Sequence, residues 1–222
     1  MKTGLIVGAN GFIGRQLINK NKIFENLITI SRTHFKNIEH KNLETYNFDI
    51  SSNWKINRNA NFLIFCATYH QFSSVEQSPI QYVNTNILGL INALEYAKDH
   101  KIEQFIYFSS IAIYGSPKSK IVNEESQINN PDLYGTSKYF AEKVLQRYAN
   151  FFQILIIRLP GVVDKEMLPT RPWLSTAINN LRKNENLNLY NQDCYFNNLI
   201  DIENIYNFIE SLVKNKKIFK LK

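Results

Sequence analysis

The chain has 222 residues, of which 44% are hydrophobic and 20% charged, a balance typical of one compact folded unit rather than a disordered chain. Its formal charge of +7 comes from scattered lysines and arginines, which argues against a nucleic-acid partner and suits an anionic small molecule. Cys66 and Cys194 are too few for a disulfide framework or a zinc site, and no apolar run approaches the ~18–20 residues of a membrane span. We therefore expect a cytoplasmic protein with no metal and no membrane segment.

Five short apolar runs, rich in β-forming residues, are separated by amphipathic stretches. The runs lack polar alternation, which is typical of strands buried on both faces of a parallel sheet. Apolar residues at helical spacing predict helices over 12–22, 84–100 and 134–152. This alternation predicts an α/β fold with a doubly wound parallel sheet. The expected strands are 4–9, 27–31, 62–67, 105–110 and 154–159.

The character of the sequence changes after residue 160. A helix is predicted over 174–184, short strands within 187–202, and a last helix over 203–215. Because this segment is too small for an independent domain, we expect residues 161–222 to form a small lobe that rests on the main sheet.

Three glycines, Gly8, Gly11 and Gly14, lie between the first predicted strand and the first helix, in the stretch GANGFIG. A glycine turn at this junction lets the backbone approach a pyrophosphate, which then lies against the N–H groups at the start of the helix. The spacing differs from the commonest dinucleotide fingerprint, and a tight turn with close packing is the alternative. Its place at the first strand–helix junction favours a dinucleotide site.

The second predicted strand ends in ISRTH, where NAD-selective sites usually carry an acid for the ribose 2′-hydroxyl. This chain has Ser31 and Arg32 instead, and an arginine suits the 2′-phosphate of NADP. Asp49 follows a third candidate strand and could accept a hydrogen bond from the adenine amine. The alternative is that Asp49 only forms a turn. These residues favour NADP over NAD.

A tyrosine and a lysine one helical turn apart stand in the stretch YGTSK, as Tyr134 and Lys138. A serine pair, Ser109 and Ser110, precedes them at the end of a predicted strand. Each feature alone is common: the first is a routine surface pair, and serines at strand ends often cap turns. Together they suggest a proton-transfer site, because a phenol needs a neighbouring positive charge to ionise near neutral pH.

Six motifs occur in order between residues 4 and 210: GANGFIG, LIFCAT, YVNTNILGLINAL, FSSIAIYG, YGTSK and NNLIDIENI. In this order they resemble the extended short-chain dehydrogenase/reductases, in their nucleotide-sugar epimerase/dehydratase branch. The resemblance implies that residues 1–160 form an NAD(P)-binding Rossmann fold and that 161–222 form the substrate-side lobe. It also implies a homodimer built on the 80–100 and 134–152 helices.

The resemblance implies a role for each residue of the site. Tyr134 is the acid/base at a substrate hydroxyl or carbonyl, Lys138 favours the phenolate and holds the nicotinamide ribose, and Ser110 binds the reacting oxygen. Ser110 is preferred to Ser109 because it lies five residues before Gly115. The residues implied to contact NADP or NAD are Gly8, Gly11, Phe12, Ile13, Gly14, Ser31, Arg32, Asp49, Ile50, Ala67, Thr68, Asn86, Tyr134, Lys138 and Pro160.

Two positions depart from the family pattern on the substrate side. Gly161 stands where many nucleotide-sugar enzymes have an asparagine, and Asn197 where an arginine commonly binds the diphosphate. Arg171 and Arg182 are candidate replacements, and solvated helix-flank residues are the alternative. Ala112 occupies the position where a dehydratase carries an acid, which argues against 4,6-dehydration.

These observations favour an NAD(P)-dependent enzyme that reduces or epimerises a 4-keto-sugar, linked to a nucleotide, in surface-polysaccharide synthesis. The small substrate-side lobe and the NADP preference favour reduction. The alternatives are a non-catalytic NAD(P)-binding regulatory protein and a reductase of a carbonyl substrate without a nucleotide.

Overall fold

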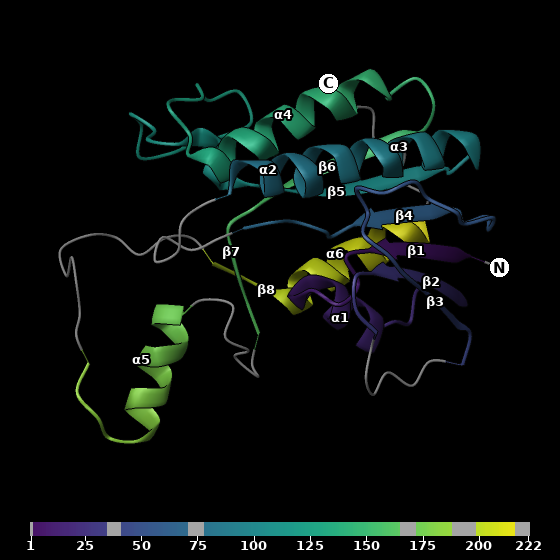
Figure 1. Ribbon diagram of the computed structural model, residues 1–222. Coiled ribbons are helices and arrows are strands. Elements are labelled where there is room, and N and C mark those ends of the chain that lie inside the picture. Colours follow the sequence, from purple (N-terminus) through teal and green to yellow (C-terminus); the bar gives the residue numbers. More distant parts are fainter. Residues whose placement is uncertain (1, 35–40, 71–77, 165–171, 188–198, 216–222) are drawn as a thin grey trace.

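The computed structural model describes residues 2–34, 41–70, 78–164, 172–187 and 199–215 (Figure 1). At its centre is a six-stranded sheet in the order β3-β2-β1-β4-β5-β6, in which every neighbouring pair is parallel. The strand order reverses between β1 and β4, so the sheet is doubly wound as predicted. The strands are β1 (Thr3–Val7), β2 (Asn26–Ser31), β3 (Leu43–Asn47), β4 (Phe62–Phe65), β5 (Gln104–Ser110) and β6 (Gln153–Leu159).

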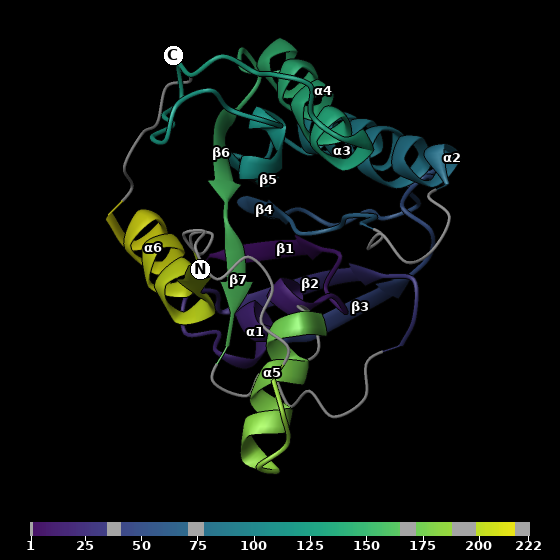
Figure 2. The same cartoon turned by 90° about the vertical axis from the view of Figure 1, so that its left-hand side faces the viewer.

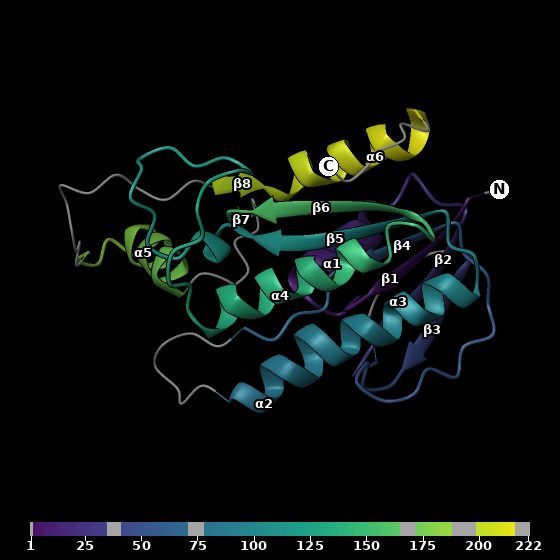
Figure 3. The same cartoon turned by 90° about the horizontal axis from the view of Figure 1, so that it is seen from above.

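Helices cover both faces of this sheet (Figures 1 and 3). On one face, Leu90 of α3 and Leu145 of α4 are buried in one core with Phe105 of β5. On the other face, Leu17 of α1 and Ile205 of α6 are buried in a second core with Ile6 of β1. Burial on both sides explains why the strands lack polar alternation. No helix of the described residues combines the length and the apolar character that crossing a membrane requires. The helices are α1 (Phe12–Asn19), α2 (Pro79–Gln81), the π-helix η1 (Tyr82–Leu88), α3 (Gly89–Asp99), the 3-10 helix η2 (Ile111–Tyr114), α4 (Leu133–Arg147), α5 (Pro172–Arg182) and α6 (Ile202–Asn215).

The helix predicted over 84–100 differs from the observed one. It begins earlier, at Pro79, and its second segment is the π-helix η1. The backbone N–H of Gly89 bonds to the carbonyl of Asn84, five residues back, where an α-helix would bond four residues back. Apolar spacing cannot distinguish such a wide turn from an ordinary one. π-Helical turns occur frequently at functional sites.

The segment after β6 forms a second, two-stranded parallel sheet of β7 (Gly161–Val163) and β8 (Leu199–Asp201). Figure 2 shows β7 continuing the path of β6 beyond the main sheet. Asp164, at the end of β7, is buried and accepts a hydrogen bond of 2.6 Å from Gln16 of α1. The chain then returns through α6, so this segment closes one face of the main sheet. Most of the stretch in which further short strands were expected lies outside the described residues.

Candidate active site

A cleft of about 800 Å3 opens at the edge where the strands of the main sheet end. In doubly wound sheets this edge, beside the point where the strand order reverses, is where ligands bind. Residues from the ends of β1, β2, β4, β5 and β6 line it together with the first turns of α1 and α4. Of the residues predicted for catalysis or cofactor contact, all line the cleft except Gly14 and Asn86.

The glycine turn closes one side of the cleft. Gly8 has a φ of +80°, and a Cβ atom there would lie 2.4 Å from the backbone nitrogen of Ala67 at the end of β4. A Cβ at Gly14 would lie 2.6 Å from the carbonyl oxygen of Gly8, so this glycine serves the packing of α1 against the turn. Gly11 is the N-cap of α1 and has no side chain to satisfy the first N–H groups of the helix. The turn therefore offers an anion a close backbone approach and a helix N-terminus.

The end of β2 and the loop after β3 line the next part of the cleft. The hydroxyl of Ser31 donates to the carbonyl of Thr33 at 2.7 Å, and Arg32 is exposed. The carboxylate of Asp49 accepts hydrogen bonds from the backbone N–H and the hydroxyl of Ser51, at 2.9 and 2.8 Å. These bonds, and then the charge of Arg32, lower the pKa of Asp49. Asp49 is thus an ionised turn residue as well as part of the lining.

Ser110 ends β5 at the base of the cleft and is the N-cap of η2. Its hydroxyl oxygen accepts a hydrogen bond of 3.1 Å from the backbone N–H of Ala112. Ser109, its neighbour, is buried and donates to the carboxylate of Glu142 in α4 at 2.5 Å. Both serines line the cleft. The hydroxyl proton of Ser109 is committed to Glu142, whereas the hydroxyl of Ser110 can donate to a ligand.

Tyr134 and Lys138 come from consecutive turns of α4. Asp132 begins this helix by accepting a hydrogen bond of 2.7 Å from the backbone N–H of Gly135. Gly135 packs so tightly on η2 that a Cβ atom there would lie 2.3 Å from the carbonyl oxygen of Ala112. The first turn of α4, which carries Tyr134, is thus held directly against the segment that follows Ser110.

The ammonium of Lys138 is buried beneath the cleft. Its Nζ donates to the carbonyl of Phe108 at 2.8 Å and lies 4.8 Å from the ring centre of Tyr107 and 5.8 Å from that of Tyr134. Burial lowers the pKa of Lys138 to about 7, partly offset by the negative charges that Cys66 and Glu142 can carry. A lysine with this pKa exchanges its proton near neutral pH, so it is suited to a proton-transfer site.

Several cleft residues were not predicted from the sequence. The clearest is His70, whose ring stacks on that of Tyr134 with 4.2 Å between ring centres. Cys66 also lines the cleft, and burial raises the pKa of its thiol. His70 follows β4 without any motif around it, so only the position of its segment in space could have identified it.

Asn86, predicted to contact the cofactor, lies next to the cleft lining, because its amide oxygen accepts a hydrogen bond of 3.3 Å from the hydroxyl of the lining residue Thr68. This side chain is buried in η1 and is not itself one of the lining residues. Its amide oxygen accepts from the backbone N–H of Tyr69 at 2.7 Å, and its amide nitrogen donates to the hydroxyl of Ser137 at 2.9 Å. Ser137 in turn donates to the carbonyl of Tyr134 at 2.7 Å. Asn86 therefore connects the segment after β4 to the helix turn of Tyr134.

The substrate side of the cleft was predicted to involve Gly161, Asn197 and a replacement arginine. Arg182 is exposed at the end of α5 and does not line the cleft, and Figures 1 and 3 show α5 beyond the edge where the main strands end. Gly161 begins β7 beside Pro160, which lines the cleft. Asn197 and Arg171 lie outside the described residues. Arg182 thus has the surroundings of a solvated helix-flank residue.

Comparison with known proteins places this architecture in a family. A sequence model described as "NAD dependent epimerase/dehydratase family" matches residues 4–209. The UDP-glucose 4-epimerase of Lactobacillus helveticus is 25% identical over 64% of this chain and 45% of that enzyme. The dTDP-D-glucose 4,6-dehydratase of Dictyostelium discoideum is 27% identical over 96% of this chain and 56% of that enzyme. The chain spans about half the length of the curated relatives that it matches.

The fold agrees with solved structures of epimerases. The UDP-glucuronic acid 4-epimerase of Bacillus cereus, solved with NAD, superimposes with a TM-score of 0.81 at 21% identity, over 97% of this chain and 75% of that one. The family model covers both the glycine turn and the Tyr134–Lys138 helix. The chain therefore belongs to the NAD-dependent epimerase/dehydratase family.

Proposed function

We propose that this protein is an NAD(P)-dependent enzyme that oxidises and reduces the C4 position of a nucleotide-linked sugar, with epimerisation as its net reaction. The observation that carries the proposal is one cleft that joins the glycine turn at Gly8 to Ser110, Tyr134 and Lys138. A dinucleotide bound in an extended shape would place its pyrophosphate at the glycine turn and its nicotinamide at the other part of the cleft, near Ser110, Tyr134 and Lys138.

The glycine turn and the start of α1 are suited to the pyrophosphate, because a side chain at Gly8 would collide with Ala67. The family is described as NAD-dependent, and the Bacillus cereus epimerase was solved in complex with NAD. At the end of β2, however, this chain carries Ser31, Arg32 and Thr33 and no carboxylate that would select NAD. We therefore propose a site that accepts both dinucleotides and favours NADP through Arg32.

The proton is handled by the protein's own side chains, while the bound dinucleotide supplies the hydride acceptor and donor. Tyr134 takes the proton of the sugar hydroxyl as a general base and returns it as a general acid. Ser110 donates a hydrogen bond to the same sugar oxygen and so orients it toward the phenol. The charged form of Lys138, 5.8 Å from the ring of Tyr134, favours the phenolate.

The nucleotide-linked substrate is inferred from the family. The relatives and structural neighbours named above act on UDP- or dTDP-linked sugars, as their names state. Because nucleotide-linked sugars are activated donors for glycosyl transfer, the product of this chain would serve polysaccharide assembly. Dehydration is disfavoured because Ala112 offers no acid or base.

A second candidate function is reduction of a 4-keto-sugar, and Arg32 favours it. An epimerase returns its hydride to the same sugar, whereas a reductase consumes reduced cofactor at every turnover. If Arg32 binds the 2′-phosphate of NADPH, the site suits a reductase, because NADPH is the common donor in biosynthetic reductions. The two functions differ in whether reduced cofactor disappears in proportion to product.

We also propose a homodimer formed through the outer surface of α2, η1 and α4. These elements lie side by side (Figure 3) and expose apolar side chains at Ile80, Val83, Leu133 and Phe140. The exposed fractions of these residues lie between 44% and 59%. Large exposed apolar side chains on neighbouring elements are typical of an interaction surface.

The experiment that tests the function is a screen of UDP- and dTDP-linked hexoses and 4-keto-hexoses with each dinucleotide. Products are identified by NMR, and the nicotinamide absorbance is followed in the same samples. Epimerisation without net cofactor oxidation supports the first candidate, and stoichiometric oxidation supports the second. A protein that binds neither NADH nor NADPH in a fluorescence titration would refute both.

A further inference from the structure

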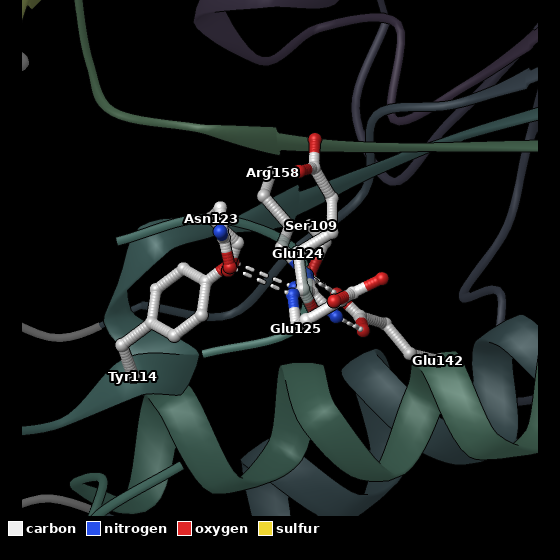
Figure 4. A network of polar contacts seen from close by, with 7 residues as sticks. All are labelled: Ser109, Tyr114, Asn123, Glu124, Glu125, Glu142 and Arg158. Carbon is white, nitrogen blue, oxygen red and sulfur yellow. Dashed lines mark hydrogen bonds and ion pairs between the residues drawn. The ribbon is translucent and has the colours of Figure 1, made fainter. Parts of the chain in front are cut away.

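An ion pair between the partly exposed Arg158 and the buried Glu142 joins β6 to α4, the helix that carries Tyr134 and Lys138 (Figure 4). The guanidinium of Arg158 in β6 donates to both carboxylate oxygens of Glu142 in α4, at 3.0 and 2.8 Å. Ser109 of β5 donates to the same carboxylate at 2.5 Å. Glu142 is 3% exposed, so its charge is almost wholly removed from solvent. The pair thus ties α4 to the ends of two neighbouring strands.

The same guanidinium also holds the segment that follows β5. Arg158 donates to the hydroxyl of Tyr114 at 2.7 Å, and its guanidinium carbon lies 5.2 Å from the centre of that ring. Tyr114 ends η2 and donates to the carbonyl of Asn123 at 2.7 Å, while Arg158 reaches the carbonyl of Glu124 at 3.2 Å. The hydrogen bonds that Arg158 donates to Glu142 and Tyr114 raise the pKa of Arg158, so the guanidinium stays charged.

The pair is connected to the elements that carry the proposed proton-transfer site, β5 and α4. Ser109, which pairs with Arg158 in the sheet register, directly precedes Ser110. Glu142 lies one helical turn after Lys138 and two turns after Tyr134, on the same side of α4. A shift of α4 relative to β5 would therefore require Glu142 to leave both Arg158 and Ser109.

We propose that the Glu142–Arg158 ion pair is a positioning device for Ser110, Tyr134 and Lys138, fixing their mutual geometry and holding the net charge behind Lys138 near zero. This inference rests on the proposed function, because it assigns a task to groups that support the proton transfer. Neither Glu142 nor Arg158 lines the cleft, so both act through other residues.

The charge balance follows from the groups around Lys138. From the residue that follows β4 it faces Cys66, whose pKa is raised by burial so that the thiol is uncharged at neutral pH. From β5 it faces the ring of Tyr107, whose phenol also has a pKa raised by burial. From α4 it faces Tyr134 and the Glu142 carboxylate, which raises the pKa of Lys138. Arg158 compensates Glu142 in turn.

Removing Glu142 should therefore lower the pKa of Lys138, and removing Arg158 should raise it. Glu142→Gln leaves the guanidinium uncompensated and should lower this pKa by about one unit, from Coulomb repulsion through a partly screened interior. Arg158→Gln leaves the carboxylate uncompensated and should raise it. The double variant Glu142→Gln/Arg158→Gln restores the charge balance and should return the pKa close to that of the wild type.

The test measures the Lys138 titration by NMR of protein labelled at lysine Cε, with the signal assigned by its loss in Lys138→Met. Turnover number, KM and NADPH affinity are measured in parallel. Glu142→Gln should lower the turnover number about tenfold while KM and cofactor affinity stay within about twofold of wild type. Ser109→Ala removes a hydrogen bond without changing any charge, and it should leave the Lys138 titration in place. Glu210→Gln is the matched control, because it breaks the ion pair with Lys214 on α6, outside the proposed site. It should change neither the Lys138 titration nor the turnover number.

The inference is overturned if both single variants titrate Lys138 as the wild type does, or if they lose cofactor affinity in proportion to turnover. Because Glu142→Gln keeps the shape of the side chain, it is expected to fold, and its far-UV circular dichroism verifies this. The Tyr134→Phe variant in the same assay separates the two proposals. If it retains full turnover, the proposed function fails, while the Lys138 titration still reports on the ion pair.

Discussion

Replacing Lys138 with methionine should make the protein more stable while it removes activity. The pKa of the buried ammonium falls from 10.5 to about 7, which corresponds to a cost of about 5 kcal/mol for keeping it charged in the folded state. Methionine avoids this cost but leaves the carbonyl of Phe108 without its donor, a loss of about 1–3 kcal/mol. The net gain at low pH is therefore about 2–4 kcal/mol.

The sign of the pH dependence follows from the same pKa. Between pH 7 and 10.5 the unfolded chain binds the lysine proton and the folded chain has released it, so the wild type gains stability as pH rises through this window. The cost of the charge is about 5 kcal/mol at pH 6 and about 2 kcal/mol at pH 9. The advantage of Lys138→Met should accordingly shrink to about zero at pH 9.

The assay is urea unfolding followed by circular dichroism at pH 6, 7, 8 and 9, without added dinucleotide. Lys143→Met, which removes an exposed lysine from the same helix, is the control and should preserve the pH slope of the wild type. A Lys138→Met variant that is less stable than the wild type at pH 6, or whose difference is the same at pH 6 and pH 9, would refute the reasoning.

Four further outcomes are expected. Tyr134→Phe should lower turnover by about 10²–10⁴-fold with NADPH affinity unchanged, measured by steady-state kinetics and fluorescence titration. Arg32→Ala should weaken NADPH binding about tenfold and leave NADH binding within about twofold, because the 2′-phosphate loses a charged hydrogen bond. Asp132→Ala removes the N-cap of α4 and should cost about 1 kcal/mol of unfolding free energy in urea. Phe140→Glu places a charge on the exposed apolar face and should yield a monomer in light scattering, whereas an unchanged dimer would exclude this surface.

Much of the fold could be predicted because its signals are local. Each strand of the main sheet except β3 contains a short apolar run, which the buried positions of β1, β2, β4 and β5 explain. β3 lies at the edge, and its pattern in LETYN is only partly buried, so the sequence indicated it weakly. The π-helical turn of η1 was missed because its apolar spacing matches that of an α-helix.

The site could be predicted where a motif marks it. Gly8 and the Tyr134–Lys138 pair are recognisable from their neighbours in the chain. His70 and Arg158 are not, because each acquires its role from residues far away in sequence: His70 through Tyr134, and Arg158 through Glu142. The cofactor role predicted for Asn86 was inferred from its motif, whereas its hydrogen bonds to Tyr69 and Ser137 depend on the folded arrangement.

The most direct measurement of the central claim compares the wild type with Tyr134→Phe on a nucleotide-linked sugar that the wild type converts. NMR follows the sugar at C4, and a fluorescence titration measures dinucleotide binding in both proteins. The account predicts equal binding and loss of conversion in the variant. Full conversion by Tyr134→Phe, with binding intact, would contradict it.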